Sequence, residues 1–326
     1  MLFKNLYSNL FAGKLARDHP INYFDIGSRG GFQKDLFPIA FAVNAIGFEP
    51  ESVALKRLDS RATSPWRMVK FLPFGVSGSG GYKKLYIPKD PSAASILEHN
   101  NQIGVKFAKP QFFELDRIEE IETQTLDEST KIAGVGAIDY LKLDIEGAEL
   151  EVLKNSSSFT ENLLALKTEV SFVEFRKGQP LANNVDAFLK TKGFVLMDFI
   201  EPANWRKEGY IIHPHTSNES PPYSRGQLMH GDYLFFRAPE ALTGHPKSLV
   251  KLALISMAFG YFDNAKMILD HINVKEYIFE KYGKTSLQVV NPASLRYGKR
   301  IFLVNLFDNI RKFVPLLRYS KNLIRK

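Results

Sequence analysis

Short apolar runs alternate with segments of helical period between residues 21 and 238. The short runs predict strands at 21–26, 43–48, 67–76, 83–87, 138–143, 163–172, 193–199 and 232–237. The segments between them predict helices after residue 31 and at 52–58, 150–153 and 185–192. Such alternation is typical of an α/β fold with a parallel sheet. We therefore predict a seven-stranded, mostly parallel sheet over residues 21–238.

Helical patterns flank this predicted domain on both sides. Residues 1–20 carry apolar groups at helical spacing and predict an N-terminal amphipathic helix. Residues 239–326 predict a helical extension, which starts with a helical hairpin at 248–271 and ends in a basic amphipathic tail. The polar segment at 88–112 reads as a long loop, and loops of that length are usually functional or disordered.

The excess positive charge is concentrated in the tail. Residues 291–326 hold nine basic residues and one acidic residue, whereas the rest of the chain holds 34 of each. A neutral body argues against a broad nucleic-acid-binding face, so we expect no nucleic-acid partner. Basic residues interleaved with apolar ones predict peripheral membrane contact through residues 291–326. The alternatives are packing of this helix on its own core or on a second subunit, as in a homo-oligomer.

Composition narrows the compartment and the chemistry. The chain has no cysteine, which excludes disulfides, thiolate metal sites and thiol catalysis. No apolar run is long enough to span a bilayer, and the N-terminus lacks the apolar core of a secretory signal. We expect a cytoplasmic protein that contacts the inner membrane surface peripherally.

The first predicted strand leads into a glycine-rich loop. Asp25, Gly27 and Gly31 form the pattern D-x-G-x-x-x-G. The dinucleotide-binding pattern G-x-G-x-x-G would require glycine at position 29 of this chain, where Arg29 stands. Glycines let the backbone pass close to a ligand. Glu49 follows the second strand, near the offset of about twenty residues at which an acid meets ribose hydroxyls. The stretch predicts a nucleotide-type site.

A second group of acids follows the strand at 138–143. Asp144, Glu146 and Glu149 come directly after it, and Glu169 belongs to the next strand. The carboxyl ends of strands in such a sheet form the ligand crevice, so these acids are expected at the ligand. The alternative is a charged turn that caps the following helix, where acids are favoured near the N-terminus.

Together these motifs resemble the FkbM family of methyltransferases. The resemblance rests on DIGSRGG, GFEPE, Thr125-Leu126-Asp127, LKLDIEGAELEVL and TEVSF, and it covers about residues 20–238. It implies a Rossmann-like fold of the class I methyltransferase type, S-adenosylmethionine as the methyl donor, and O-methylation of a hydroxyl, often on a sugar or a natural product.

The resemblance also implies roles for individual residues. Asp25, Gly27 and Gly31 would line the methionine end, Glu49 would bind the ribose, and Asp144 would flank the methyl-transfer centre. The full expected cofactor set is Asp25, Gly27, Ser28, Gly31, Glu49, Gly75, Val76 and Asp144. The chain departs from the family at Ser28-Arg29, where Ala-Asn is usual, and it lacks the acid often found after the third strand.

Transfer of a methyl group to a hydroxyl benefits from a base. We expect Asp144 or Glu146 to be that base and Glu169 to orient the substrate; His99, His213 and His230 are rival bases. We expect no metal site. The expected acceptor is a small molecule or a lipid-linked glycan. A nucleic-acid methyltransferase and a non-catalytic scaffold that uses the hairpin and tail are the alternative functions.

Overall fold

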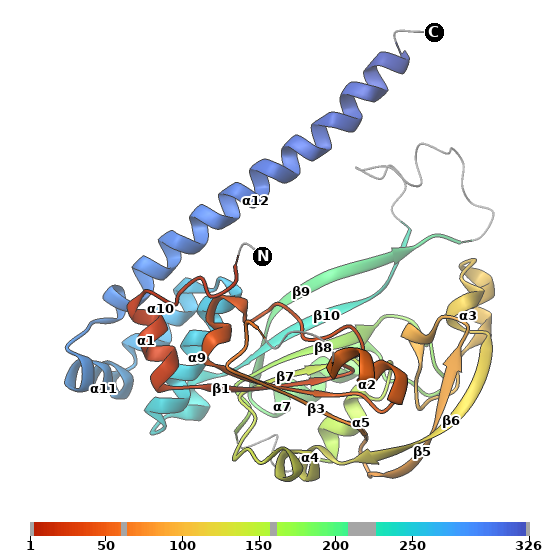
Figure 1. Ribbon diagram of the computed structural model, residues 1–326, viewed down its shortest axis with the longest axis horizontal. Coiled ribbons are helices and arrows are strands. Elements are labelled where there is room, and N and C mark those ends of the chain that lie inside the picture. Colours follow the sequence, from red (N-terminus) through yellow and green to blue (C-terminus); the bar gives the residue numbers. More distant parts are fainter. Residues whose placement is uncertain (1–2, 60–63, 157–161, 208–225, 324–326) are drawn as a thin grey trace.

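The computed structural model describes residues 3–59, 64–156, 162–207 and 226–323, with side chains to residue 310. Its main sheet has seven strands (Figure 1). In spatial order these are β3 (Met68–Leu72), β2 (Val43–Phe48), β1 (Ile21–Ile26), β7 (Tyr140–Leu143), β8 (Ala165–Ser171), β10 (Gln227–Arg237) and β9 (Phe194–Trp205). The predicted seven-stranded sheet is confirmed.

Strand directions locate the ligand crevice. The first five strands in this order are mutually parallel, and β10 is antiparallel to both β8 and β9. The chain order reverses between β1 and β7, which are neighbours in the sheet although more than 100 residues separate them. Ligands of open α/β sheets bind outside the carboxyl ends of the strands at such a reversal.

Alternating side chains cover both faces of the sheet. On β1, Ile21 and Tyr23 join one apolar core, while Phe24 and Ile26 join a second core on the opposite face. Successive side chains of a strand point to opposite faces, so a sheet buried on both sides gives a nearly continuous apolar run. The strand-like runs of the sequence reflect this burial.

Helices cover both faces. α4 (Leu126–Ala133), α5 (Glu149–Lys154) and α7 (Ala182–Thr191) contribute to the second core. α1 (Phe11–Asp18) and α9 (Pro246–Phe259) contribute to the first core. The other α-helices of the described residues are α2 (Ser52–Asp59), α3 (Asn101–Lys106), α10 (Phe262–Asp270), α11 (Ile272–Tyr282) and α12 (Ser286–Leu323). No described helix is both long and apolar enough to cross a bilayer.

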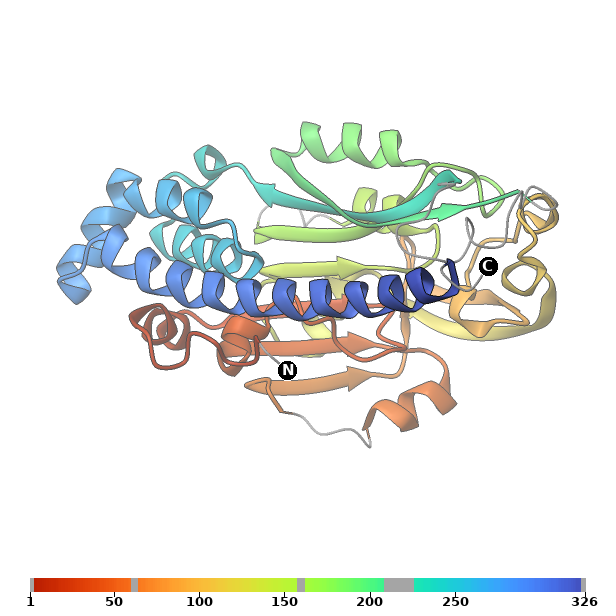
Figure 2. The same cartoon turned by 90° about the horizontal axis from the view of Figure 1, so that it is seen from above.

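The C-terminal extension is integral to the fold. Leu252, Ala253 and Ile255 of α9 are fully buried in the same core as Tyr23 and Tyr140 of the sheet. α10 and α11 pack beside α9, and α12 leaves this group as a long projecting helix (Figures 1 and 2). The extension therefore completes one face of the sheet, while its boundary as a domain stays a prediction.

A small second sheet stands at the carboxyl end of the main one (Figure 1). It contains β4 (Gly75–Val76), β6 (Leu115–Gln124) and β5 (Gly81–Pro88). The strand predicted over 67–76 is thus divided between the two sheets. β6 is absent from the prediction because apolar groups recur at every third position within LDRIEEIETQ, a spacing closer to a helix than to a strand.

Two helix predictions and one loop prediction also differ from the structure. Residues 3–10 form turns, so the N-terminal helix is limited to α1. The glycine loop is followed by a kinked 3₁₀ helix at Phe37–Ala42 instead of an α-helix, so no α-helix N-terminus faces that loop. Residues 88–112 include α3 and two 3₁₀ turns.

Candidate active site

A cavity of about 540 Å³ lies at the carboxyl ends of β2, β1, β7 and β8. Ligand pockets are typically about 300–1,000 Å³, so it is large enough for a small molecule. Of the eight residues expected to bind cofactor, six line it: Gly27, Gly31, Glu49, Gly75, Val76 and Asp144. Asp25 and Ser28 do not line the cavity.

Asp25 and Ser28 lie beneath the cavity floor. Asp25 is fully buried and accepts hydrogen bonds from the Tyr23 hydroxyl (2.9 Å) and the Gln33 amide (3.3 Å). The Ser28 hydroxyl donates to the Asp25 carbonyl and accepts from the Phe48 amide, which ties the end of β1 to the end of β2. In this structure both residues hold the loop in place.

Lys142 connects the floor to the site. Its Nζ lies 3.3 Å from Asp25 Oδ1 and 3.1 Å from Asp144 Oδ2, and it also donates to the Gly27 carbonyl at 3.5 Å. Burial alone would lower the pKa of Lys142, but the two carboxylates outweigh it and raise that pKa. A lysine inside the buried strand YLKL is the sequence signal that could have revealed this role.

Gly27 is in direct contact with the strand that carries the acids. Its φ is +91°, and a Cβ there would lie 1.9 Å from the backbone oxygen of Asp144. A side chain would therefore collide with backbone that has little freedom to move. Glycine is required at this position by conformation and by space.

We expect Gly27→Ala to lower the free energy of unfolding by at least ~2 kcal/mol, because a left-handed alanine costs roughly 1–2 kcal/mol before the collision is counted. Gly30→Ala, in the same loop, is the matched control. A Cβ at Gly30 meets no atom within 4 Å, and its φ is not positive, so the change should stay within about 0.5 kcal/mol. Urea unfolding of both variants measures the difference; equal stability would contradict this reading of Gly27.

Glu49 forms the cavity wall at the end of β2. The residue is only 5% exposed, and its Oε1 accepts a hydrogen bond from the Glu51 amide at 2.9 Å. Burial raises the pKa of Glu49, against the hydrogen bond from Glu51 and the charge of Arg29. Arg29, which stands in place of the fingerprint glycine, also lines the cavity and pairs with Glu51 at 2.7 Å.

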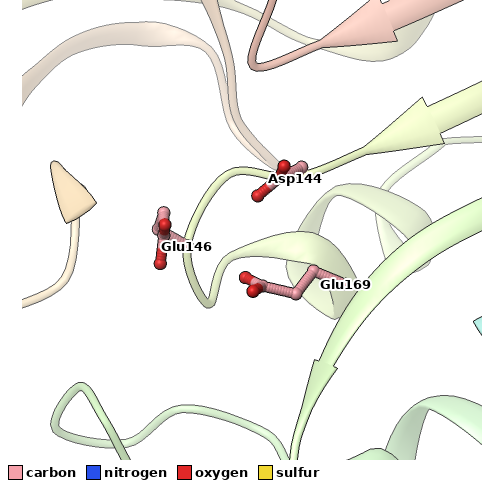
Figure 3. Close-up of side chains that lie close together, drawn as sticks. All are labelled: Asp144, Glu146 and Glu169. Atoms are coloured by element: carbon pink, nitrogen blue, oxygen red, sulfur yellow. The ribbon is translucent and has the colours of Figure 1, made fainter. Parts of the chain in front are cut away.

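Three carboxylates gather at the other side of the cavity (Figure 3). Asp144 and Glu146 come from the loop after β7, and Glu169 comes from β8. One oxygen of each lies within 4.8 Å of an oxygen of the other two. All three line the cavity. The structure therefore brings together the three acids that were expected to be catalytic.

Basic side chains pair with two of these acids. Lys142 holds Asp144, as described above, and the guanidinium of Arg176 forms an ion pair with Glu146. Glu146 has a φ of +61°, unusual for a side-chain-bearing residue, and the Ser95 hydroxyl donates to its carbonyl at 2.8 Å. Backbone strain of this kind tends to collect at functional sites.

Glu169 differs from the other two acids. Within the described ranges no lysine or arginine forms an ion pair with it; its carboxylate Oε1 lies 2.8 Å from Nδ1 of His230, on the antiparallel strand β10. Burial, reinforced by the charge of Asp144, raises the pKa of Glu169 well above its usual range. Burial lowers the pKa of His230.

The three histidines proposed as rival bases have different surroundings. His99 is buried, and its Nε2 hydrogen-bonds the Ala93 carbonyl at 2.9 Å, away from the cavity lining. His213 lies outside the described residues. His230 does not line the cavity, and its Nδ1 lies within hydrogen-bond distance of Glu169, so it is placed to orient that acid.

The three acids also have a donor set that suits a divalent cation. However, Lys142 and Arg176 already supply positive charge to two of them. The expectation of no metal site stays a prediction.

Known proteins resemble this chain in sequence and in fold. The sequence profile of the methyltransferase FkbM domain matches residues 35–196. Among curated proteins, Methyltransferase sdnD of Sordaria araneosa is 28% identical over 189 residues, which cover 52% of this chain and 70% of that protein.

Two solved structures show a distant likeness. One, from Listeria monocytogenes, is described as an S-adenosylmethionine-dependent methyltransferase; it has a TM-score of 0.34 and 10% identity, and the match covers 72% of this chain and 98% of that one. The other is TrmK of M. capricolum with S-adenosyl-homocysteine, with a TM-score of 0.30, 10% identity and coverage of 86% and 96%. At these TM-scores neither likeness supports an argument. The profile match, the curated relative and the sheet topology are sufficient: this chain is a methyltransferase and belongs to the FkbM family.

Proposed function

We propose that this protein transfers a methyl group from S-adenosylmethionine to a hydroxyl of a carbohydrate or a related acceptor. One observation carries the proposal. A single cavity joins the glycine loop and Glu49 to the carboxylates of Asp144, Glu146 and Glu169. The cavity thus combines residues suited to a nucleoside with carboxylates that could accept the proton of a hydroxyl.

The cavity residues fit S-adenosylmethionine. Gly30 borders open space, where a side chain would meet no protein atom, so the loop leaves room for a ligand. Glu49 presents a carboxylate suited to ribose hydroxyls. Gly27 and Gly31 would contact the methionine end of the cofactor, and Gly75 and Val76 would contact its adenine. When bound, this cofactor supplies a methyl group activated on a sulfonium.

The proton of the acceptor hydroxyl needs a base. Lys142 pairs with Asp144 and Arg176 pairs with Glu146, although burial still raises the pKa of Glu146 well above its usual range. Burial also raises the pKa of Glu169, which lines the cavity, and among the described residues no lysine or arginine forms an ion pair with this acid. We infer that Glu169 takes the hydroxyl proton as the oxygen gains its methyl group, while His230 holds the carboxylate in position.

The hydroxyls and carboxylates among the cavity residues favour an acceptor with several hydroxyls. Ser92 and Ser95 line the cavity from the segment at 88–112, beside the carboxylates. Serine hydroxyls and carboxylates can hydrogen-bond the hydroxyls of a sugar, which an apolar natural product lacks. The neutral body does not favour nucleic acid, and a formed cavity does not favour a non-catalytic scaffold.

We expect Glu49→Ala to weaken S-adenosylmethionine binding by about 100-fold or more, since hydrogen bonds to a charged group are each worth about 1.5–3 kcal/mol. Calorimetric titration measures the dissociation constant. Glu98→Ala is the control, because Glu98 pairs with Lys177 at the surface and should not affect binding. Unchanged affinity in Glu49→Ala would contradict the assignment of Glu49.

The transfer itself is tested by labelled methyl transfer from S-adenosylmethionine to fractionated glycans, lipid-linked glycans and small polyols. We expect the labelled methyl group to resist hydrolysis by mild base and to be found in a methyl ether of the acceptor. Label on nitrogen or on nucleic acid would overturn the acceptor class. Absence of cofactor binding by the unmodified chain would overturn the activity as a whole.

A further inference from the structure

The last helix, α12, leaves the body of the protein. Its first turns pack on α1 and α10, and Val289, Val290 and Ala293 are buried there. From residue 305 to 310, every residue is exposed, which covers more than one full turn. The helix then continues to Leu323 (Figure 1). No other described part of the chain covers this segment.

The exposed part of α12 has an apolar side. Between residues 295 and 310, five large apolar side chains are 44–67% exposed: Leu295, Phe302, Leu306, Phe307 and Ile310. At about 3.6 residues per turn, they fall within an arc of roughly 140°. Asn305 and Asp308 lie on the opposite side. An exposed apolar surface of this kind marks an interaction site.

Basic residues accompany the apolar side. Arg296, Lys299 and Arg300 lie within this arc or beside it, by the same helical spacing. With Lys4 they also line an open groove of about 590 Å³ between the N-terminal turns and the start of α12. The sequence adds six more basic residues from Arg311 onward and no acid after Asp308.

We propose that α12 docks this protein on an anionic bilayer surface, with its apolar side in the interface and its basic residues at the lipid phosphates. Amphipathic helices with apolar and basic groups bind membranes in this way without spanning them. The charge selects this occupant. A second copy would bring a tail of the same strong positive charge, and nucleic acid would leave the apolar side chains in water.

Docking would also orient the active site. α12 starts among the helices at the amino ends of the strands and runs towards the side of the molecule where their carboxyl ends lie (Figures 1 and 2). The cavity opens at those carboxyl ends. A bound α12 would thus fix the orientation of the cavity relative to the bilayer, which matters for an acceptor anchored in lipid.

Flotation of the full-length protein with vesicles tests the proposal. Vesicles of phosphatidylcholine are compared with vesicles that also contain phosphatidylglycerol, at low and high salt. We expect binding to the anionic vesicles that high salt weakens. Lys299→Gln/Arg300→Gln should lower the partition coefficient by about 30-fold, on the basis of about 1 kcal/mol per basic residue. Its control, Lys89→Gln/Lys177→Gln, removes the same charge from exposed sites on the body.

A second pair of variants tests the apolar side. Phe302→Glu/Ile310→Glu should abolish flotation, whereas Tyr82→Glu/Val105→Glu, at exposed apolar positions away from α12, should leave it unchanged. Equal binding to neutral and anionic vesicles, or equal loss in the control variants, would overturn the proposal. Two other results would also overturn it if the unmodified protein binds no vesicle. One is a dimer that Phe302→Glu/Ile310→Glu dissociates, and the other is binding of RNA.

Discussion

Replacing Glu169 with glutamine is expected to lower kcat by about 10²–10⁴-fold, the usual contribution of general-base catalysis. Glutamine keeps the size of the side chain and a hydrogen-bond acceptor for His230, but it cannot take a proton. The dissociation constant for S-adenosylmethionine should stay within a few-fold of the unmodified value. The measurement is single-turnover methyl transfer on the acceptor found by the label screen, beside a calorimetric titration.

The pH dependence provides an independent check. Since the pKa of Glu169 is raised by burial and by the charge of Asp144, the base is protonated at acid pH and becomes active only above that raised pKa. The rate should therefore fall as pH decreases, in a window above the usual carboxyl range, and this limb should vanish in Glu169→Gln. A variant with a full rate and an intact acid limb would contradict the role of Glu169.

Two neighbouring acids serve as controls for this assignment. Glu146→Gln and Asp144→Asn remove charges that are already paired with Arg176 and Lys142. We expect them to affect folding or substrate affinity more than the acid limb of the rate. If Asp144→Asn or Glu146→Gln removes that limb instead, the base is that acid, as one of the two candidates from the sequence.

The sheet was predictable because its strands are buried on both faces. A continuous apolar run such as the one ending at Ile26 records that burial directly. β6 was not predictable, because it belongs to a small sheet in which most of its residues remain exposed. The association of α9 with the main core was not predictable either, because it depends on contacts between distant segments, such as Tyr7 with Met257.

The acids of the site were predictable, whereas their partners were not. Asp144, Glu146 and Glu169 follow from the rule that ligands bind at the carboxyl ends of strands. Arg176 and His230 reach these acids through tertiary structure, from segments 30 and 61 residues further along the chain. No local spacing encodes those distances. In the proposed mechanism, these partners distinguish the acid that acts as the base from the other two.

Lys142→Met is expected to lower the free energy of unfolding by about 3–5 kcal/mol, the usual cost of removing one partner of a buried ion pair. Asp25 is fully buried, and Lys142 is its only basic partner among the described residues. Methionine fills a similar volume without the charge, so Asp25 must either stay ionised without a counter-charge or take up a proton. Denaturant unfolding measures the loss.

The pH dependence and a second substitution separate charge from packing. Burial already raises the folded-state pKa of Asp25, and without Lys142 this pKa rises further. The variant should therefore lose stability as pH increases through that pKa and regain stability in acid. The double variant Lys142→Met/Asp25→Asn should recover a large part of the loss, because no buried charge remains there. Lys190→Met, at an exposed pair with Asp186, should change stability by less than about 1 kcal/mol. If Lys142→Met matches the unmodified protein at neutral pH, or if Asp25→Asn recovers nothing, this ion pair does not hold the floor of the site.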